Sequence, residues 1–168
     1  MVYNKKMKKE IIWAPWRMGY ILGEKKEGCF LCSAYKSKNL TKNYVIEKNK
    51  NAFVVMNIFP YNNGHLMVAP KRHIAEFEQL TEDEILSINM FIRKSIIILK
   101  NVLKPEGFNI GVNIGKVSGA GVETHIHFHI VPRWTGDTNF MPVISNTKVI
   151  PQALDELYEK LKKEFKKG

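Results

Sequence analysis

The first pattern in the chain is a series of short apolar runs, each bounded by residues that favour turns. Their β-branched and aromatic side chains predict five strands, at residues 44–47, 52–56, 65–70, 108–114 and 125–131. Lys48-Asn49-Lys50-Asn51 separates the first two, and Asn62-Asn63-Gly64 precedes the third. Strands joined by such short turns are expected to pair antiparallel.

Two longer segments have the period of a helix. Thr81 followed by Glu84 is a capping-box signature, and the run that starts there ends before Pro105. Its apolar side chains recur at helical spacing, at Ile85, Ile88, Ile92, Ile96, Leu99 and Leu103. A second stripe follows Pro151 and consists of Leu154, Leu157, Tyr158, Leu161 and Phe165. We therefore predict one long central helix and a shorter C-terminal helix.

These elements favour an α+β fold, with an antiparallel sheet of about five strands, one long helix and a C-terminal helix. A chain of 168 residues can bury one hydrophobic core, and no repeat or linker divides it. We expect a single domain over residues 1–168, with an irregular N-terminal segment (1–43), a core (44–145) and a C-terminal extension (146–168).

Composition limits the partners and the compartment. The formal charge of +10 is mostly lysine, clustered near both ends, which favours phosphate-bearing partners without separating a nucleotide from a nucleic acid. No run approaches the roughly 18 apolar residues that span a bilayer. The lysine-rich N-terminus leads into Trp13-Ala14-Pro15-Trp16 rather than an apolar signal core. We expect a cytoplasmic protein without a membrane partner.

Three histidines, His125, His127 and His129, alternate with large apolar residues in the last predicted strand. Alternate side chains of a strand share one face, so successive imidazoles would lie roughly 6.6–7 Å apart along it. A single histidine on a strand would mean little, because it usually satisfies a local hydrogen bond. Three in alternation predict a site.

Two chemistries suit such a face. Neutral imidazole can bind a metal, or it can attack phosphorus with neighbouring imidazoles as acid and donor. The glycine-rich stretch from Gly115 to Gly121 precedes the strand and can turn backbone N–H groups toward an anion. The loop and the histidines together indicate a phosphate that reacts at His127.

The run from His125 to Val131 matches the signature of the histidine-triad (HIT) family, which the sequence resembles. The similarity extends to Asn57 through Pro70, Lys71-Arg72-His73 and Pro132-Arg133-Trp134, and it spans about residues 28–145. The flanking segments 13–17 and 134–142 look most like the diadenosine tetraphosphate phosphorylase branch, close to the fragile-histidine-triad proteins. The resemblance implies a HIT-like fold, a homodimer and an AMP-containing nucleotide substrate.

The resemblance also implies a mechanism. His127 would attack the α-phosphate to give a nucleotidyl-histidine, which water or inorganic phosphate then cleaves. His129 would donate to a phosphate oxygen or to the leaving group, and main-chain donors near Gly121 and Val122 would hold the developing charge. His65 corresponds to an additional histidine near the phosphate. No metal is required at the phosphate.

The same resemblance places further side chains at the nucleotide, namely Asn57 at the ribose, Ile58, Phe59 and Met67 at the base, and Asn113 and Ser118 at phosphate. Core packing is the alternative role for the apolar residues, and turn formation is the alternative for Asn113. One position departs from the pattern. Hydrolase members usually carry a glutamine four residues before the first triad histidine, where this chain has Gly121. The departure favours the phosphorylase branch.

Cys29 and Cys32 form a C-x-x-C pair, a spacing that suits redox chemistry or half of a zinc site. The chain lacks the thioredoxin-like βαβ setting of a redox pair, and zinc needs two more ligands. By the family resemblance, His73 and His125 complete a structural Cys2His2 zinc site. His125 would then be a metal ligand rather than a catalyst.

Two other functions stay open. One keeps the fold but hydrolyses adenosine phosphoramidates or aminoacyl-adenylates. The other is a zinc-stabilised nucleic-acid-binding module whose basic ends grip a phosphate backbone. Because the chain lacks a recognition motif such as an aromatic strand, we expect a nucleotide and not a nucleic acid as its partner.

Overall fold

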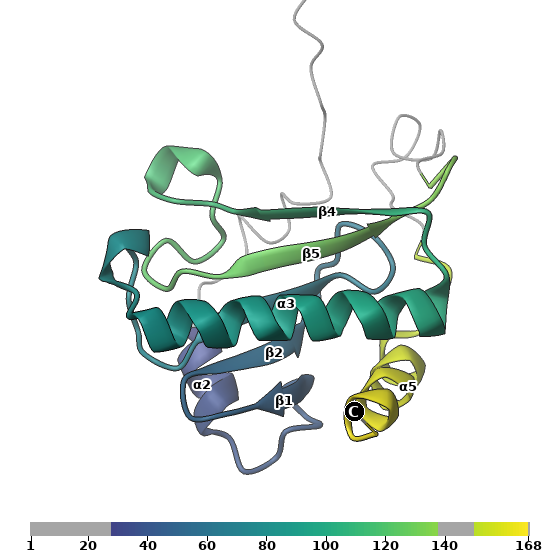
Figure 1. Cartoon of the computed structure of the whole chain (residues 1–168), viewed down its shortest axis with the longest axis horizontal. Coiled ribbons are helices and arrows are strands. Elements are labelled where there is room, and N and C mark those ends of the chain that lie inside the picture. The colour runs from purple at the N-terminus through teal and green to yellow at the C-terminus, as the bar shows by residue number, and fades with distance from the viewer. Residues whose placement is uncertain (1–27, 138–149, 168) are drawn as a thin grey trace, which may run out of the picture.

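Five strands form one antiparallel sheet in the computed structural model, which describes residues 28–137 and 150–167 (Figure 1). They are β1 (Val45–Lys48), β2 (Ala52–Met56), β3 (Leu66–Pro70), β4 (Gly107–Val112) and β5 (Phe128–Arg133). The strand order is β1-β2-β3-β5-β4, and every neighbouring pair is antiparallel. The predicted α+β class and antiparallel sheet are confirmed, with β1 and β4 at the edges.

The long helix α3 (Glu82–Leu103) crosses one face of the sheet (Figure 1). It begins with the predicted capping box: the Thr81 hydroxyl accepts from the Glu84 N–H, and the Glu84 carboxylate accepts from the Thr81 N–H. Helix α5 (Leu154–Phe165) contacts both α3 and β1. Within the described residues, no helix combines the length and apolarity needed to cross a membrane.

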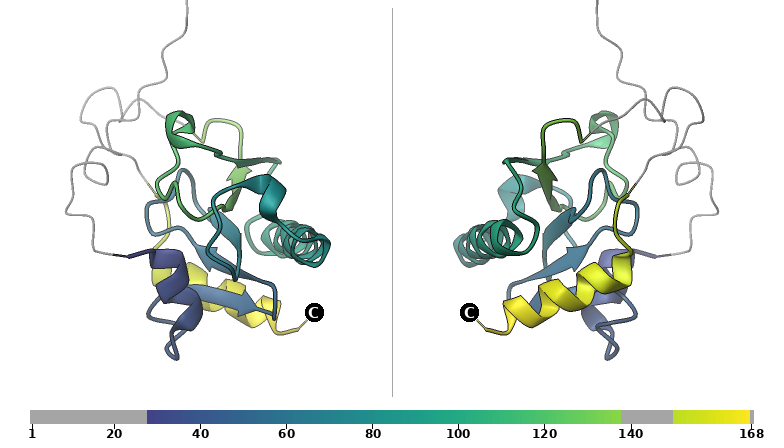
Figure 2. Two further views of the ribbon diagram at one scale, coloured as in Figure 1. Left: turned by 90° about the vertical axis from the view of Figure 1, so that its left-hand side faces the viewer. Right: turned by 90° about the vertical axis from the view of Figure 1, so that its right-hand side faces the viewer.

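The inner strands β2 and β3 are buried on both faces of the sheet, and each face has its own hydrophobic cluster. On one face, β-strand side chains such as Val54 and Val68 pack against α3 and α5. On the other face, the short helix α2 (Phe30–Lys36) covers Phe53, Val55 and Met67 through Leu31. Figure 2 shows α2 and α3 on opposite sides of the sheet. Successive side chains of a strand therefore enter different clusters.

Helix α2 corrects the prediction of irregular backbone over residues 1–43, which is wrong for residues 30–36. The helix has 7 residues, buries only Leu31 and Ala34, and has no side-chain hydrogen bond at its N-cap, Cys29. So short a segment shows neither a clear helical period nor a start signal in the sequence.

The start of the last strand also differs from the prediction, because β5 begins at Phe128 and not at His125. The Ile126 N–H donates to the Ile74 carbonyl (2.7 Å) instead of joining the sheet ladder. Pairing with β3 accordingly begins at Phe128, opposite Val68. The other predicted strands agree to within two residues at their ends.

A tight turn at Gly64 brings the chain into β3. Gly64 has φ +75°, a conformation that L side chains rarely adopt. A Cβ at this position would lie 2.5 Å from Cδ1 of Leu103 and 3.3 Å from Cγ of Pro132. Glycine thus allows the loop to pack against the ends of α3 and β5, and it places His65 directly before the start of β3.

Candidate active site and metal site

The predicted site residues gather on the face of the sheet that α2 covers, near β3 and β5. Met67 of β3 belongs to the α2-side cluster and pairs directly with His129 of β5. The rings of His127 and His129 are side by side, with centroids 4.9 Å apart. His125 turns instead toward His73 and two thiols. The three histidines therefore divide between two clusters.

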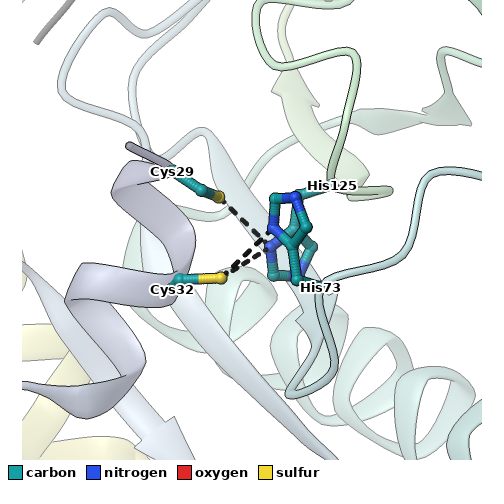
Figure 3. A group of neighbouring side chains, drawn as sticks. All are labelled: Cys29, Cys32, His73 and His125. Atoms are coloured by element: carbon teal, nitrogen blue, oxygen red, sulfur yellow. Dashed lines mark hydrogen bonds between the residues drawn. The ribbon is translucent and has the colours of Figure 1, made fainter. Parts of the chain in front are cut away.

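Four side chains with metal-binding atoms come together from separate parts of the chain: Cys29 and Cys32 at the start of α2, His73 after β3, and His125 before β5 (Figure 3). These ligand atoms all lie within 4.8 Å of one another. Nδ1 of His125 is 3.2 Å from Sγ of Cys29 and 3.5 Å from Sγ of Cys32, which is 3.3 Å from Nδ1 of His73.

This spacing suits a tetrahedral metal site. With bonds of roughly 2.0–2.3 Å, neighbouring ligand atoms of a zinc site lie about 3.3–3.8 Å apart. Burial raises the pKa of the Cys32 thiol, and the neighbouring Cys29 raises it further. The Cys32 thiol therefore resists ionisation until a cation compensates its charge. The group can hold a metal ion.

His125 presents one defined nitrogen to the thiols. The distance from its Nε2 to the Pro70 carbonyl is 2.9 Å, and the side chain is fully buried. Because a carbonyl only accepts, Nε2 carries the proton and Nδ1 keeps its lone pair. Burial lowers the pKa of His125, which favours the neutral ring that a metal requires.

His127 is oriented by the main chain of His125. Nδ1 of His127 lies 2.9 Å from the His125 carbonyl, so Nδ1 carries the proton and Nε2 keeps its lone pair, as the predicted nucleophile requires. Burial lowers the pKa of His127, so the ring is neutral near pH 7. One residue, His125, thus contributes its side chain to the Cys/His cluster and its carbonyl to the orientation of the His127 ring.

His65 and His129 form a second hydrogen-bonded chain. The Tyr61 N–H donates to Nδ1 of His65 (3.0 Å), which places the His65 proton on Nε2 when the ring is neutral. That Nε2 lies 2.9 Å from Nδ1 of His129, which accepts. His129 therefore carries its proton on Nε2, as a hydrogen-bond donor to a phosphate would. The local backbone selects the tautomer of both rings.

Three groups that orient the histidines were not predicted from the sequence: Tyr61 and the carbonyls of Pro70 and His125. The Tyr61 ring stacks on His65, with centroids 4.9 Å apart and an interplanar angle of 18°. The spacing of Tyr61, four residues before His65, is the feature of the sequence that could have indicated this contact, since a loop residue there can close a turn around the imidazole. Main-chain acceptors leave no such signal in the side-chain pattern.

The loop between β2 and β3 holds the predicted ribose and base contacts. The Asn57 amide accepts from the Phe59 N–H (2.9 Å) and lies 3.3 Å from Nδ1 of His65. Ile58 and Phe59 are 52% and 58% exposed, so both present apolar surface to solvent, and their predicted contact with the base stays a prediction. Met67 is buried within the α2-side cluster, which corresponds to the alternative of core packing.

The glycine-rich loop contains a single 3-10 turn, η3 (Lys116–Ser118), between Gly115 (φ +77°) and Gly119 (φ +81°). Ser118 is exposed, and its hydroxyl donates to the Gly115 carbonyl (2.7 Å) within this turn. Asn113 is half-buried just before the loop, and Gly121 and Val122 follow it. Their predicted phosphate contacts remain predictions.

A carboxylate after β5 fixes the outer edge of the site. Asp137 accepts two hydrogen bonds from Arg133 (2.6 and 3.0 Å) and one from Nδ2 of Asn62 (2.8 Å). Nδ2 of Asn62 also donates to the Pro132 carbonyl (3.0 Å). The end of β5 is thereby tied to the loop that carries Asn57 and Tyr61. Residues 13–17 and 138–142 of the predicted similarity lie outside the described residues.

Comparison with known proteins agrees with this arrangement. A family model described as the HIT domain matches residues 38–136, and the AP-4-A phosphorylase of Mycobacterium tuberculosis is 39% identical over 151 residues. That alignment covers 85% of this chain and 77% of the relative.

Solved structures show the same fold. A hypothetical histidine triad nucleotide-binding protein from Sulfolobus tokodaii has a TM-score of 0.64 at 25% identity, covering 83% of this chain and 90% of its own. A zinc-bound histidine triad family protein from Mycobacterium smegmatis also has a TM-score of 0.64, at 21% identity, covering 83% of this chain and 94% of its own. With a family model matched over most of the described core and a relative at this level of identity, the chain belongs to the HIT family.

Proposed function

We propose that this protein is a nucleotidyltransferase that cleaves adenosine dinucleotide polyphosphates, such as diadenosine tetraphosphate, through a covalent intermediate on His127. The observation that carries the proposal is the buried His127 ring, whose Nδ1 is bound to the His125 carbonyl so that Nε2 has a free lone pair. The 39% identical M. tuberculosis relative, named AP-4-A phosphorylase, supports the substrate class.

In the first step, Nε2 of His127 forms a bond to the α-phosphorus, and the bond from that phosphorus to the bridging oxygen breaks. ATP leaves and AMP stays on the ring. The His129 proton on Nε2 stabilises charge on the phosphate oxygens, while His65 keeps His129 in the required tautomer. In the second step, an oxygen of inorganic phosphate attacks the same phosphorus, releasing ADP and restoring neutral His127.

Product analysis tests the reaction. Incubation of the purified protein with diadenosine tetraphosphate and inorganic phosphate should release ADP and ATP in equal amounts, and omission of phosphate should stop turnover. AMP and ATP formed in water would instead identify a hydrolase. Turnover of adenosine phosphoramidate or an aminoacyl-adenylate, without cleavage of the dinucleotide, would contradict the proposed substrate class.

Trapping tests the covalent intermediate independently of the products. After brief reaction with α-labelled substrate, the wild-type protein should carry acid-labile label, as a phosphoramidate bond predicts. His127→Ala should carry none, while Ser33→Ala, at an exposed position of α2, should still be labelled. Label that persists on His127→Ala would overturn the assignment.

We also propose that Cys29, Cys32, His73 and His125 hold a structural zinc ion. Their donor set and spacing suit tetrahedral coordination, and a related protein of this fold is zinc-bound. Zinc would tie α2 and the segments before β5 and after β3 together. Elemental analysis of protein purified without chelator should give about one equivalent, and less than about a tenth would contradict the proposal.

A homodimer is the proposed assembly. Strand β4 is a sheet edge with Ile110 46% exposed, and α3 exposes Leu86, Met90 and Ile97. An exposed edge strand beside exposed apolar side chains favours pairing with a second copy. Light scattering should give about twice the chain mass, and Ile97→Glu should shift it toward the monomer. We also propose a cytoplasmic location, because two cysteines at C-x-x-C spacing suit a metal site and are too few for a disulfide scaffold.

A further inference from the structure

A second charged surface lies away from the histidines, where α5 meets the loop before β1. Two adjoining concavities occupy this place, and they share Thr41 and Lys162. Both are shallow and open to solvent, with volumes of about 490 and 520 Å³. In Figure 1, α5 lies below β4 and β5, next to the β1 edge. The catalytic strand β5 is three strands away from β1, or about 14 Å at ordinary strand spacing.

The lining of these concavities is strongly basic. Five of their side chains are lysines and one is acidic, namely Lys38, Lys160, Lys162, Lys163, Lys166 and Glu159. Within residues 28–137 and 150–167, no ion pair involves any of these five lysines. Lysines at i and i+4, such as Lys162 and Lys166, repel each other and destabilise a helix. A bound polyanion would remove this repulsion.

Lys162 is the fixed element of the surface. Its ammonium donates to the Thr41 hydroxyl (3.0 Å) and to the Tyr158 hydroxyl (2.7 Å), which itself donates to the Val45 carbonyl (3.0 Å). Tyr158 is buried, so Lys162 is anchored to the sheet edge through a rigid contact. An ammonium has three donors, and a third N–H remains for an anion in the concavities that Lys162 lines.

We propose that this lysine surface, made of Lys38, Lys160, Lys162, Lys163 and Lys166, binds linear inorganic polyphosphate. Lys160 and Lys166 are about 9 Å apart along the helix, so a single phosphate cannot contact both. A ligand that contacts both must carry several phosphates. No aromatic side chain lines either concavity, whereas single-strand nucleic-acid sites interleave aromatic rings for base stacking. The surface therefore matches a chain of phosphates without bases. The proposal is independent of the reaction at His127.

Binding of inorganic polyphosphate, measured by calorimetry at low and high salt, tests the proposal. The triple variant Lys160→Gln/Lys163→Gln/Lys166→Gln keeps the anchored Lys162 and should bind at least about tenfold more weakly. The matched control Lys50→Gln/Lys100→Gln/Lys104→Gln removes the same charge from exposed positions elsewhere and should bind within about twofold of wild type. A melting curve of each variant shows that it is folded.

Three results would overturn the proposal. The control variant could lose as much affinity as the triple variant, which would mean that net charge alone attracts the polymer. A single-stranded RNA or duplex DNA of equal phosphate content could bind more tightly than polyphosphate, which would assign the surface to nucleic acid. At equal concentration of phosphate groups, orthophosphate could bind as tightly as the polymer, which would show that the surface is a site for single anions.

Discussion

The triad histidines fall into two groups with different surroundings: His125 alone, and His127 with His129. His125 is fully buried among two thiols, His73 and a backbone carbonyl, in a setting that favours a closed metal site. His127 lies against His129, which is hydrogen-bonded to His65, and these hydrogen bonds set which nitrogen of His127 and of His129 carries the proton. Histidines of one sequence motif thus have different roles. The hydrogen bond at one nitrogen of each ring determines whether the other nitrogen presents a lone pair or an N–H.

The two groups are also connected, because the His125 carbonyl orients His127. Movement of His125 would rotate the peptide that holds the nucleophile, even if no catalytic side chain were changed. A metal bound to the His125 side chain would limit that movement. The comparison therefore predicts an asymmetry. Loss of a metal ligand should disturb the orientation of His127, whereas replacement of His127 should leave the metal group intact.

The largest expected effect is that of His127→Ala. Removal of the nucleophile should lower kcat by about a thousandfold or more, while zinc content and the melting temperature stay near the wild-type values. Steady-state kinetics and elemental analysis of the same preparation check both parts. Loss of zinc from this variant would show that the two clusters do not separate as the structure indicates.

A second effect, smaller in rate but larger in stability, is expected for Cys32→Ser. Zinc content should fall to background and the melting temperature by about 10 °C, since the metal group joins α2 to the sheet. The orientation of His127 should loosen, and kcat should fall by about tenfold. Ser33→Ala, an exposed residue in the same helix, is the matched control and should change neither. Unchanged kcat in the zinc-free protein would disprove the connection through His125.

His65→Ala should lower kcat by about 10–100-fold without loss of zinc, because His129 would no longer be held with its proton on Nε2. His65→Gln keeps an N–H donor near Nδ1 of His129, so it should recover part of the lost rate. Kinetics of both variants, with the melting temperature as a check on folding, distinguish this positioning role from a general packing effect. Equal losses in the two variants would argue against the tautomer chain.

The smallest effect concerns the anchor beside His73. Arg72 binds the buried Glu84 carboxylate at 2.6–2.7 Å and lowers the pKa of that carboxyl. Because the folded pKa lies below the unfolded value, the contact stabilises the protein above about pH 4.5, and the benefit is lost as pH falls through the folded pKa. Glu84→Gln should lower the melting temperature by about 3–8 °C at pH 6.

The difference between Glu84→Gln and wild type should shrink on acidification, as the pH falls from about 4.5 through the lowered pKa of the folded carboxyl. Thermal melts at several pH values measure it. A constant difference between pH 6 and pH 3 would show that the loss comes from the capping box alone and not from the ion pair.

The sequence predicted the sheet and the long helix well because their signals are local. Thr81, Glu84 and the apolar period define α3, and β2 has the predicted bounds. The metal group could be assembled only through family resemblance, since Cys32 and His125 are 93 positions apart. The tautomers could not be predicted at all. They depend on main-chain donors and acceptors at Tyr61, Pro70 and His125, which any residue type would supply.

Gly64 limits how the protein can change. It has no side chain to contribute to catalysis, yet its φ of +75° strains any L side chain, and a Cβ there would also displace Leu103, whose Cδ1 would lie 2.5 Å away. In a library of substitutions at every position, Gly64 should be as intolerant as a catalytic histidine. A map of mutational tolerance would therefore highlight Gly64, which has no catalytic side chain. Intolerance to substitution alone would wrongly identify it as a catalytic residue.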